Sequence, residues 1–69
     1  MRLSARNQLR GTITSIELGA VMATVTLRLD GGQQVSAAVT RASVEELGLT
    51  VGAPATAVIK STEVMIGVD

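Results

Sequence analysis

Apolar and polar residues alternate along most of this 69-residue chain, which predicts a protein built mainly of β-strands. The alternation is clearest over residues 21–29, where every odd position is apolar and nearly every even one is polar. A period of two is typical of a strand with one face in the core. Residues 9–16 and 33–39 have the same character, and Asp30-Gly31-Gly32 predicts a tight turn because glycine accepts positive φ angles.

The period changes at Thr40, where a short helix is predicted. Val44 and Leu47 have near-helical spacing, and Gly48 is a natural residue to end the helix. Ser43-x-x-Glu46 matches a capping box, with Thr40 as the alternative N-cap. Two apolar stretches follow the helix and predict strands over residues 55–59 and 64–68.

The predicted order of three strands, a helix and two strands indicates one domain over residues 1–69. The expected fold class is mostly β, a small Greek-key β-barrel with one short α-helix. Hydrophobic residues make up 46% of the chain but none is aromatic, so the core must be aliphatic. Cysteine is absent, which excludes disulfides and thiolate metal sites. Because so small a domain is marginal alone, we expect a homo-oligomer.

The composition also narrows the function. The net charge is zero and no aromatic residue is present to stack on bases, so we expect no nucleic-acid partner. Histidine is absent as well, which excludes a catalytic triad and a typical zinc site, and an enzyme is the least favoured class. No stretch reaches the roughly 20 apolar residues of a membrane span. We expect a soluble cytoplasmic protein that does not associate with membranes.

Three short segments combine a cation with hydroxyl or amide donors, and they are the candidate functional residues. The segments are Ser4-Ala5-Arg6-Asn7-Gln8, Thr40-Arg41-Ala42-Ser43 and Lys60-Ser61-Thr62. Convergent donors with positive charge suit a small oxyanion. Each segment also has a structural interpretation: Thr40 and Ser43 as helix caps, Arg6 as a solvated surface residue, and Lys60 as protection of a sheet edge.

Longer motifs around these segments resemble the molbindins, small molybdenum-binding proteins also known as Mop domains. The motifs are Ser4-Ala5-Arg6-Asn7-Gln8-Leu9-Arg10-Gly11, Ser43-Val44-Glu45-Glu46-Leu47-Gly48 and Ala57-Val58-Ile59-Lys60-Ser61-Thr62-Glu63-Val64-Met65-Ile66. The resemblance spans essentially the whole chain and implies an OB-like barrel. It also implies hexamers, arranged as trimers of dimers, that bind molybdate or tungstate at subunit interfaces for intracellular storage and homeostasis. The alternative is a ligand-sensing interaction module of a molybdate transporter or regulator.

The resemblance also assigns oxyanion-binding residues by position. It implies that Ser4, Ala5 and Arg6 supply hydroxyl and backbone donors, and that Thr40 and Ser43 supply donors at the helix start. It further implies that Lys60 and Ser61 close the site, together with groups from a neighbouring subunit. No protein atom is expected to ligate the metal directly.

Overall fold

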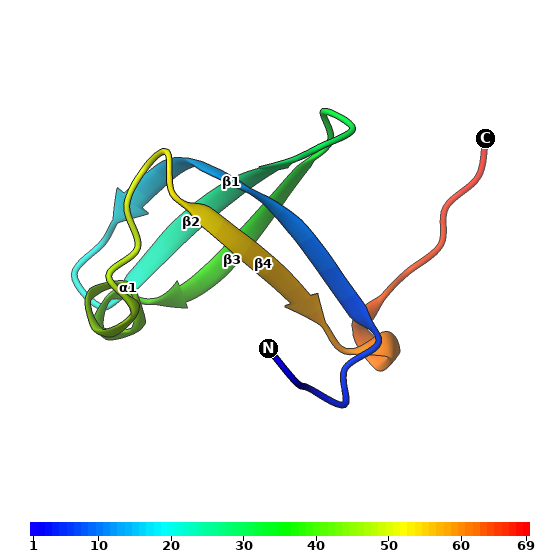
Figure 1. Cartoon of the computed structure of the whole chain (residues 1–69), viewed down its shortest axis with the longest axis horizontal. Helices are drawn as coiled ribbons and strands as arrows, with labels where there is room; N and C mark the ends of the chain where they lie inside the picture. The colour runs from blue at the N-terminus through cyan, green and yellow to red at the C-terminus, as the bar shows by residue number, and fades with distance from the viewer.

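A four-stranded antiparallel sheet that curls on itself dominates the computed structural model, which describes residues 1–69 (Figure 1). The strands are β1 (Asn7–Leu18), β2 (Met22–Leu29), β3 (Gln34–Thr40) and β4 (Pro54–Ile59). Their order across the sheet is β3-β2-β1-β4. The single helix α1 (Arg41–Leu47) lies at one end, and a 3₁₀ turn, η1 (Ser61–Glu63), follows β4. The prediction of a mostly β domain with one short helix is confirmed.

The long strand β1 joins the two halves of the sheet. Its first half pairs with β4, from Asn7 opposite Ile59 to Thr12 opposite Pro54. Its second half pairs with β2, and the two ladders overlap at Gly11 and Thr12. A Cβ atom at Gly11 would lie 2.6 Å from the carbonyl oxygen of Arg28, which is closer than packed atoms allow. Glycine is therefore required where the strand turns from one partner to the other.

A β-bulge in β1 changes which of its side chains face the core. Ile13 lies opposite Leu27, but the next paired residue is Ser15, opposite Thr26, so Thr14 is an extra residue. The alternation predicted over residues 9–16 requires Ile13 and Ile16 to lie on opposite faces of the strand, and in this respect the prediction is wrong. The bulge reverses the alternation, and both isoleucines pack against the core.

The core is small and wholly aliphatic. Only five residues are buried: Ile13, Ala23, Val25, Leu27 and Val44. Three of them come from the inward face of β2, as the alternation predicted. Val44 reaches the same cluster from α1, which covers one end of the curled sheet. The predicted inward position of Val21 is wrong, because this residue precedes β2 and is 71% exposed.

Both ends of α1 are fixed by local hydrogen bonding. Thr40 has extended backbone geometry as the last residue of β3, and its side chain accepts a hydrogen bond from the backbone N–H of Ser43. Thr40, the alternative N-cap, is therefore the one that forms, and the predicted capping box that starts at Ser43 is wrong because Ser43 lies inside the first turn. Gly48 ends the helix in the left-handed region, with φ 62°, as predicted.

The predicted last strand over residues 64–68 is absent from this chain. After η1 the backbone runs away from the sheet without pairing with any strand (Figure 1). Its large side chains are exposed: Val64 by 46%, Met65 by 91%, Ile66 by 88% and Val68 by 93%. A strand forms only where an edge is available for pairing, and the path of this segment does not reach one.

Replacing Ile13 with alanine should strongly destabilise the fold, because Ile13 is 1% exposed and lies at the centre of a five-residue core. We expect a loss of about 2–5 kcal/mol in the free energy of unfolding, measured by urea denaturation. Val21→Ala removes a similar aliphatic side chain that is 71% exposed, and it should change the same quantity by less than about 0.5 kcal/mol. Equal effects of the two substitutions would contradict this description of the core.

Candidate anion-binding site

Two of the three predicted donor segments meet at one end of the sheet. Asn7, the first residue of β1, lies opposite Ile59, the last residue of β4, and its side-chain amide donates to the Ile59 carbonyl at 3.2 Å. The segment Ser4–Arg6 directly precedes β1, and Lys60 and Ser61 directly follow β4. The N-terminal segment and η1 therefore lie side by side, at the lower right of Figure 1.

The polar side chains of this cluster have no partner within the chain. Ser4, Arg6, Lys60 and Ser61 are all exposed, and none makes a side-chain hydrogen bond or ion pair. The half-buried Ala5 is held by its carbonyl, which accepts a hydrogen bond from the Gln8 side-chain amide at 2.9 Å. Gln8 thus satisfies the Ala5 carbonyl. The hydroxyls of Ser4 and Ser61 and the charged groups of Arg6 and Lys60 stay free for a ligand.

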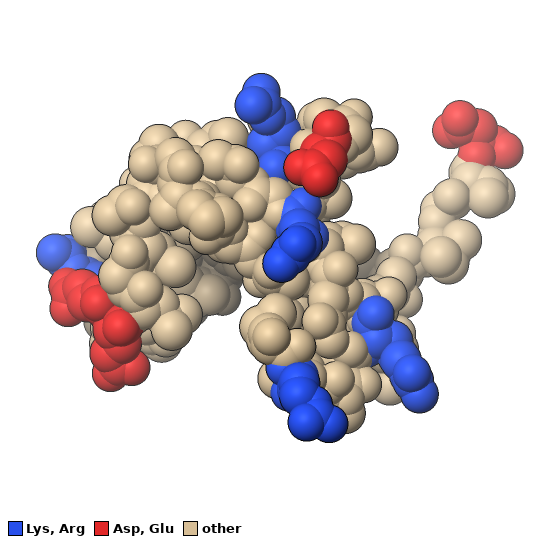
Figure 2. Space-filling view, in the orientation of Figure 1, with Lys and Arg blue, Asp and Glu red and all other residues tan.

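Charge is distributed unevenly along the molecule. Three of the six cations lie at the end that holds the cluster: Arg2, Arg6 and Lys60. Three of the six acids lie at the other end, on β1 and α1: Glu17, Glu45 and Glu46. Each end also holds one opposite charge, Glu63 in η1 and Arg41 in α1. In Figure 2 blue side chains lie at the lower right, and red ones beside a single blue one lie at the lower left. The sequence prediction did not include Arg2. The excess of cations gives the cluster end a positive potential that attracts anions.

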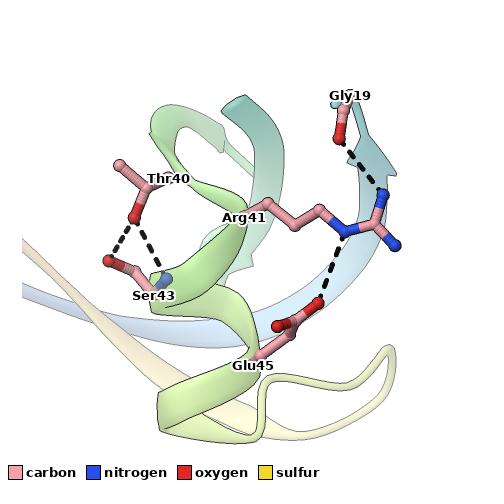
Figure 3. Close-up of polar contacts among 5 residues, drawn as sticks. All are labelled: Gly19, Thr40, Arg41, Ser43 and Glu45. Carbon is pink, nitrogen blue, oxygen red and sulfur yellow. Dashed lines mark hydrogen bonds and ion pairs between the residues drawn. The ribbon is translucent and has the colours of Figure 1, made fainter. Parts of the chain in front are cut away.

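The third predicted segment is at the opposite end of the molecule, where α1 begins. The Thr40 and Ser43 hydroxyls lie 2.7 Å apart, and the Ser43 backbone N–H donates to the Thr40 oxygen at 3.0 Å (Figure 3). Arg41 is engaged as well, because its guanidinium contacts Glu45 and the Gly19 carbonyl, each at 3.3 Å. The polar groups of this segment therefore fix the helix start and tie it to the β1–β2 turn.

The seven predicted residues accordingly form two separate groups within one chain. The structure brings together Ser4, Ala5, Arg6, Lys60 and Ser61. Thr40 and Ser43 lie at the other end of a molecule whose longest dimension is 36 Å. A single anion contacts both groups only if they belong to different copies of the chain.

The donor set of the first group suits an oxyanion and not a bare cation. It offers hydroxyl, guanidinium and ammonium donors and no carboxylate. No three histidine, cysteine or acidic side chains come together anywhere in the chain in a way that would hold a metal ion. The structure also has no helix with the length and apolar character needed to span a bilayer.

Comparison with known proteins identifies close similarity over the full length. The family model described as the TOBE domain matches residues 3–66. The chain is 51% identical to a probable molybdenum-pterin-binding protein of Haemophilus influenzae, and the match covers 100% of both chains.

Two solved structures share the fold. MopII from Clostridium pasteurianum superposes with a TM-score of 0.93 and is 46% identical, covering 97% of this chain and 100% of that one. The cytoplasmic molybdate-binding protein ModG, solved with molybdate bound, superposes with a TM-score of 0.95 and is 55% identical. That match covers 100% of this chain and 49% of ModG, so ModG is about twice as long.

Thr40→Ala tests whether Thr40 stabilises the ligand-free protein as a helix cap. Removing the hydroxyl leaves the Ser43 backbone N–H without its acceptor, so we expect a loss of about 1 kcal/mol in the free energy of unfolding without any anion present. Thr40→Ser should restore most of the loss. Thr50→Ala is the control, because Thr50 is exposed and its side chain makes no hydrogen bond. An unchanged stability in Thr40→Ala would show that the hydroxyl does not support the fold.

Proposed function

This chain belongs to the molbindin family and carries its TOBE domain, and from that premise we propose that it binds molybdate and tungstate to store and buffer molybdenum in the cell. The observation that carries the proposal is the group of unpartnered donors formed by Ser4, Arg6, Lys60 and Ser61. Molybdate is a tetrahedral dianion whose oxygens all accept hydrogen bonds, so an exposed set of donors with two cations matches its requirements.

We propose that the complete site lies between subunits. Ser4, Ala5, Arg6, Lys60 and Ser61 of one copy form one wall, and Thr40 and Ser43 of another copy supply donors from the start of α1. The separation of the two groups within one chain supports this arrangement. A Ser43 or Thr40 hydroxyl can turn its hydrogen to an anion while its oxygen keeps accepting the capping bond, because a hydroxyl both donates and accepts. The assembly is a hexamer built as a trimer of dimers.

The protein acts as a binding protein without catalysis. The similar proteins bear the names of binding proteins, and the cluster contains no group that is suited to act as a general base near neutral pH. Its place of action is the cytoplasm, as is stated for ModG.

The donor-only site explains how molybdate is selected over other anions. Phosphate keeps a proton on part of its population at neutral pH, and that proton finds no acceptor in the site. A buried polar group without a partner costs about 1–3 kcal/mol, and about 1.4 kcal/mol corresponds to a tenfold change in affinity. Sulfate is also a dianion, so it must be rejected by size, since molybdate and tungstate are larger.

Calorimetric titration should therefore rank the anions in a definite order. We expect tight binding of molybdate and tungstate, weaker binding of sulfate, and binding of phosphate that is weaker than that of molybdate by up to about one to two orders of magnitude. The titrations should share one pH and one ionic strength, because screening changes the affinity of every anion. Equal affinities for sulfate and molybdate would refute selection by size.

Lys60→Ala should abolish most of the stabilisation that molybdate gives. A ligand that binds only the folded, assembled protein raises its melting temperature by mass action, and loss of a charged hydrogen bond weakens binding by about 1.5–3 kcal/mol. Lys60 is exposed and its side chain makes no hydrogen bond or ion pair, so the melting temperature without anion should stay close to the parent's. Arg28→Ala is the matched control, because it removes an exposed cation from the middle of the sheet, outside the cluster. Parent-like molybdate binding by Lys60→Ala would show that Lys60 is not part of the site.

A further inference from the structure

The turn that joins β2 to β3 contains the one aspartate in this sequence that is followed by a glycine, Asp30-Gly31. The turn projects beyond the sheet, and both residues are exposed (Figure 1). A cleft of about 360 Å³ lies beside it, and the residues that line this cleft are polar or glycine apart from Leu29. Water therefore reaches the Asp30 carboxyl group and the peptide bond that follows it.

The Asp30 carboxylate and the Gly31 backbone N–H are both without a partner. The carboxylate makes no hydrogen bond or ion pair. Two backbone hydrogen bonds close the turn: the Leu29 N–H donates to the Gln33 carbonyl at 2.8 Å, and the Gly32 N–H donates to the Leu29 carbonyl at 2.9 Å. The Gly31 N–H takes part in neither and has no other acceptor within the chain. Because glycine has no Cβ, nothing of its own screens this nitrogen.

We propose that Asp30-Gly31 is a site of spontaneous covalent modification, at which aspartate converts to isoaspartate through a succinimide ring. The Gly31 nitrogen attacks Cγ of the protonated Asp30 carboxyl group, and the new N–Cγ bond closes the ring. The carboxyl hydroxyl leaves as water with the proton from the nitrogen. A second water then opens the ring. When it breaks the bond between the Asp30 main-chain carbonyl carbon and the Gly31 nitrogen, the backbone runs through Cγ and the product is isoaspartate. When it breaks the N–Cγ bond, aspartate is restored.

Asn7 has a side chain of the same length but is protected from this reaction. It lies in β1, opposite Ile59 of β4, and its side-chain amide donates to the Ile59 carbonyl at 3.2 Å. The residue that follows is Gln8, whose side chain crowds the nitrogen that would attack. The chain therefore carries its own internal comparison for the turn.

The modification alters the hairpin that carries most of the core. Isoaspartate adds one backbone atom between Asp30 and Gly31, inside the loops closed by the two hydrogen bonds of Leu29. The register of a hairpin depends on the length of its turn, and β2 supplies three of the five buried residues. We therefore expect the isoaspartyl form to melt at a lower temperature. No residue of the donor cluster lines the cleft, so the donors stay in place.

Ageing the purified protein in water labelled with heavy oxygen tests the proposal. After storage at neutral pH the protein is digested with trypsin in ordinary water, and cleavage after Arg28 and Arg41 releases residues 29–41, in which Asp30 is the one aspartate and no asparagine occurs. Mass spectrometry identifies isoaspartate by its fragment ions. We expect isoaspartate at Asp30 that carries one heavy oxygen for each passage through the ring, and a rate at least several-fold above the deamidation of Asn7 in residues 7–10. Isoaspartate that is absent, that lacks the label, or that forms no faster than Asn7 deamidates would overturn the proposal.

Substitutions within the turn separate this reaction from general ageing. Gly31→Ala places a methyl group beside the attacking nitrogen, and we expect isoaspartate to form several-fold more slowly. The fold should be kept, because Gly31 does not have a positive φ and the added Cβ is closest to Oε1 at the end of the flexible Gln33 side chain. Thr50→Ala, an exposed change outside the turn, should leave the rate at Asp30 unchanged. Equal rates in Gly31→Ala and the parent would contradict attack by the Gly31 nitrogen.

The melting temperature of the aged protein gives a second readout. Asp30→Glu keeps the charge but lengthens the side chain, so the succinimide ring cannot form. We expect the melting temperature of the parent to fall in proportion to its isoaspartate content, while that of Asp30→Glu stays constant over the same period. An equal fall in both proteins would overturn the link between the modification and the hairpin. All these measurements are made without anion, so their failure would leave the proposed molybdate site untouched.

Discussion

The close approach of two backbones at Gly11 sets the shape of the whole molecule. At this residue β1 passes from pairing with β4 to pairing with β2, and a side chain of any size would meet the carbonyl of Arg28. The contact allows a single strand of 12 residues to serve both halves of the sheet. The sheet curls as a result, with the start of β1 beside the end of β4, and with β3 and β4 held apart as unpaired edges.

The curvature of the sheet also determines where the donors of the proposed anion site lie. The pairing of Asn7 with Ile59 brings the segments before β1 and after β4 together, so donors that are more than 50 residues apart in sequence form one cluster. The start of α1 lies at the opposite end of the molecule from this cluster. The Thr40 and Ser43 hydroxyls are hydrogen-bonded there and stabilise the start of the helix. One chain thus holds two incomplete parts of the proposed anion site, and a contact between copies is needed to join them.

The sequence predicts the regular parts of this structure well and the irregular parts poorly. Alternation identified the buried face of β2, and glycine chemistry identified the Asp30-Gly31-Gly32 turn and the end of α1, because each depends on neighbouring residues alone. The bulge at Thr14 could not be predicted, because no residue type or spacing in the sequence marks it. It places Ile16 on the core side of the sheet. Residues 64–68 have the pattern of a strand, but whether a strand forms depends on an available edge, which no local pattern specifies. The sequence motifs indicated all three donor segments. Only the pairing of β1 with β4 shows that the segment before β1 and the segment after β4 lie next to each other.

The small core leaves much of the apolar surface of this chain exposed. Nearly half of its residues are hydrophobic, yet only five are buried, and thirteen large hydrophobic residues remain exposed. Apolar contacts between copies provide stabilisation but define geometry loosely, whereas an anion held by several donors demands exact positions. In the assembly that we propose, cations such as Arg6 and Lys60 repel one another when subunits approach, and a bound dianion offsets that repulsion. In that proposal apolar burial supplies the tendency to assemble, and the anion selects the arrangement in which its donors converge.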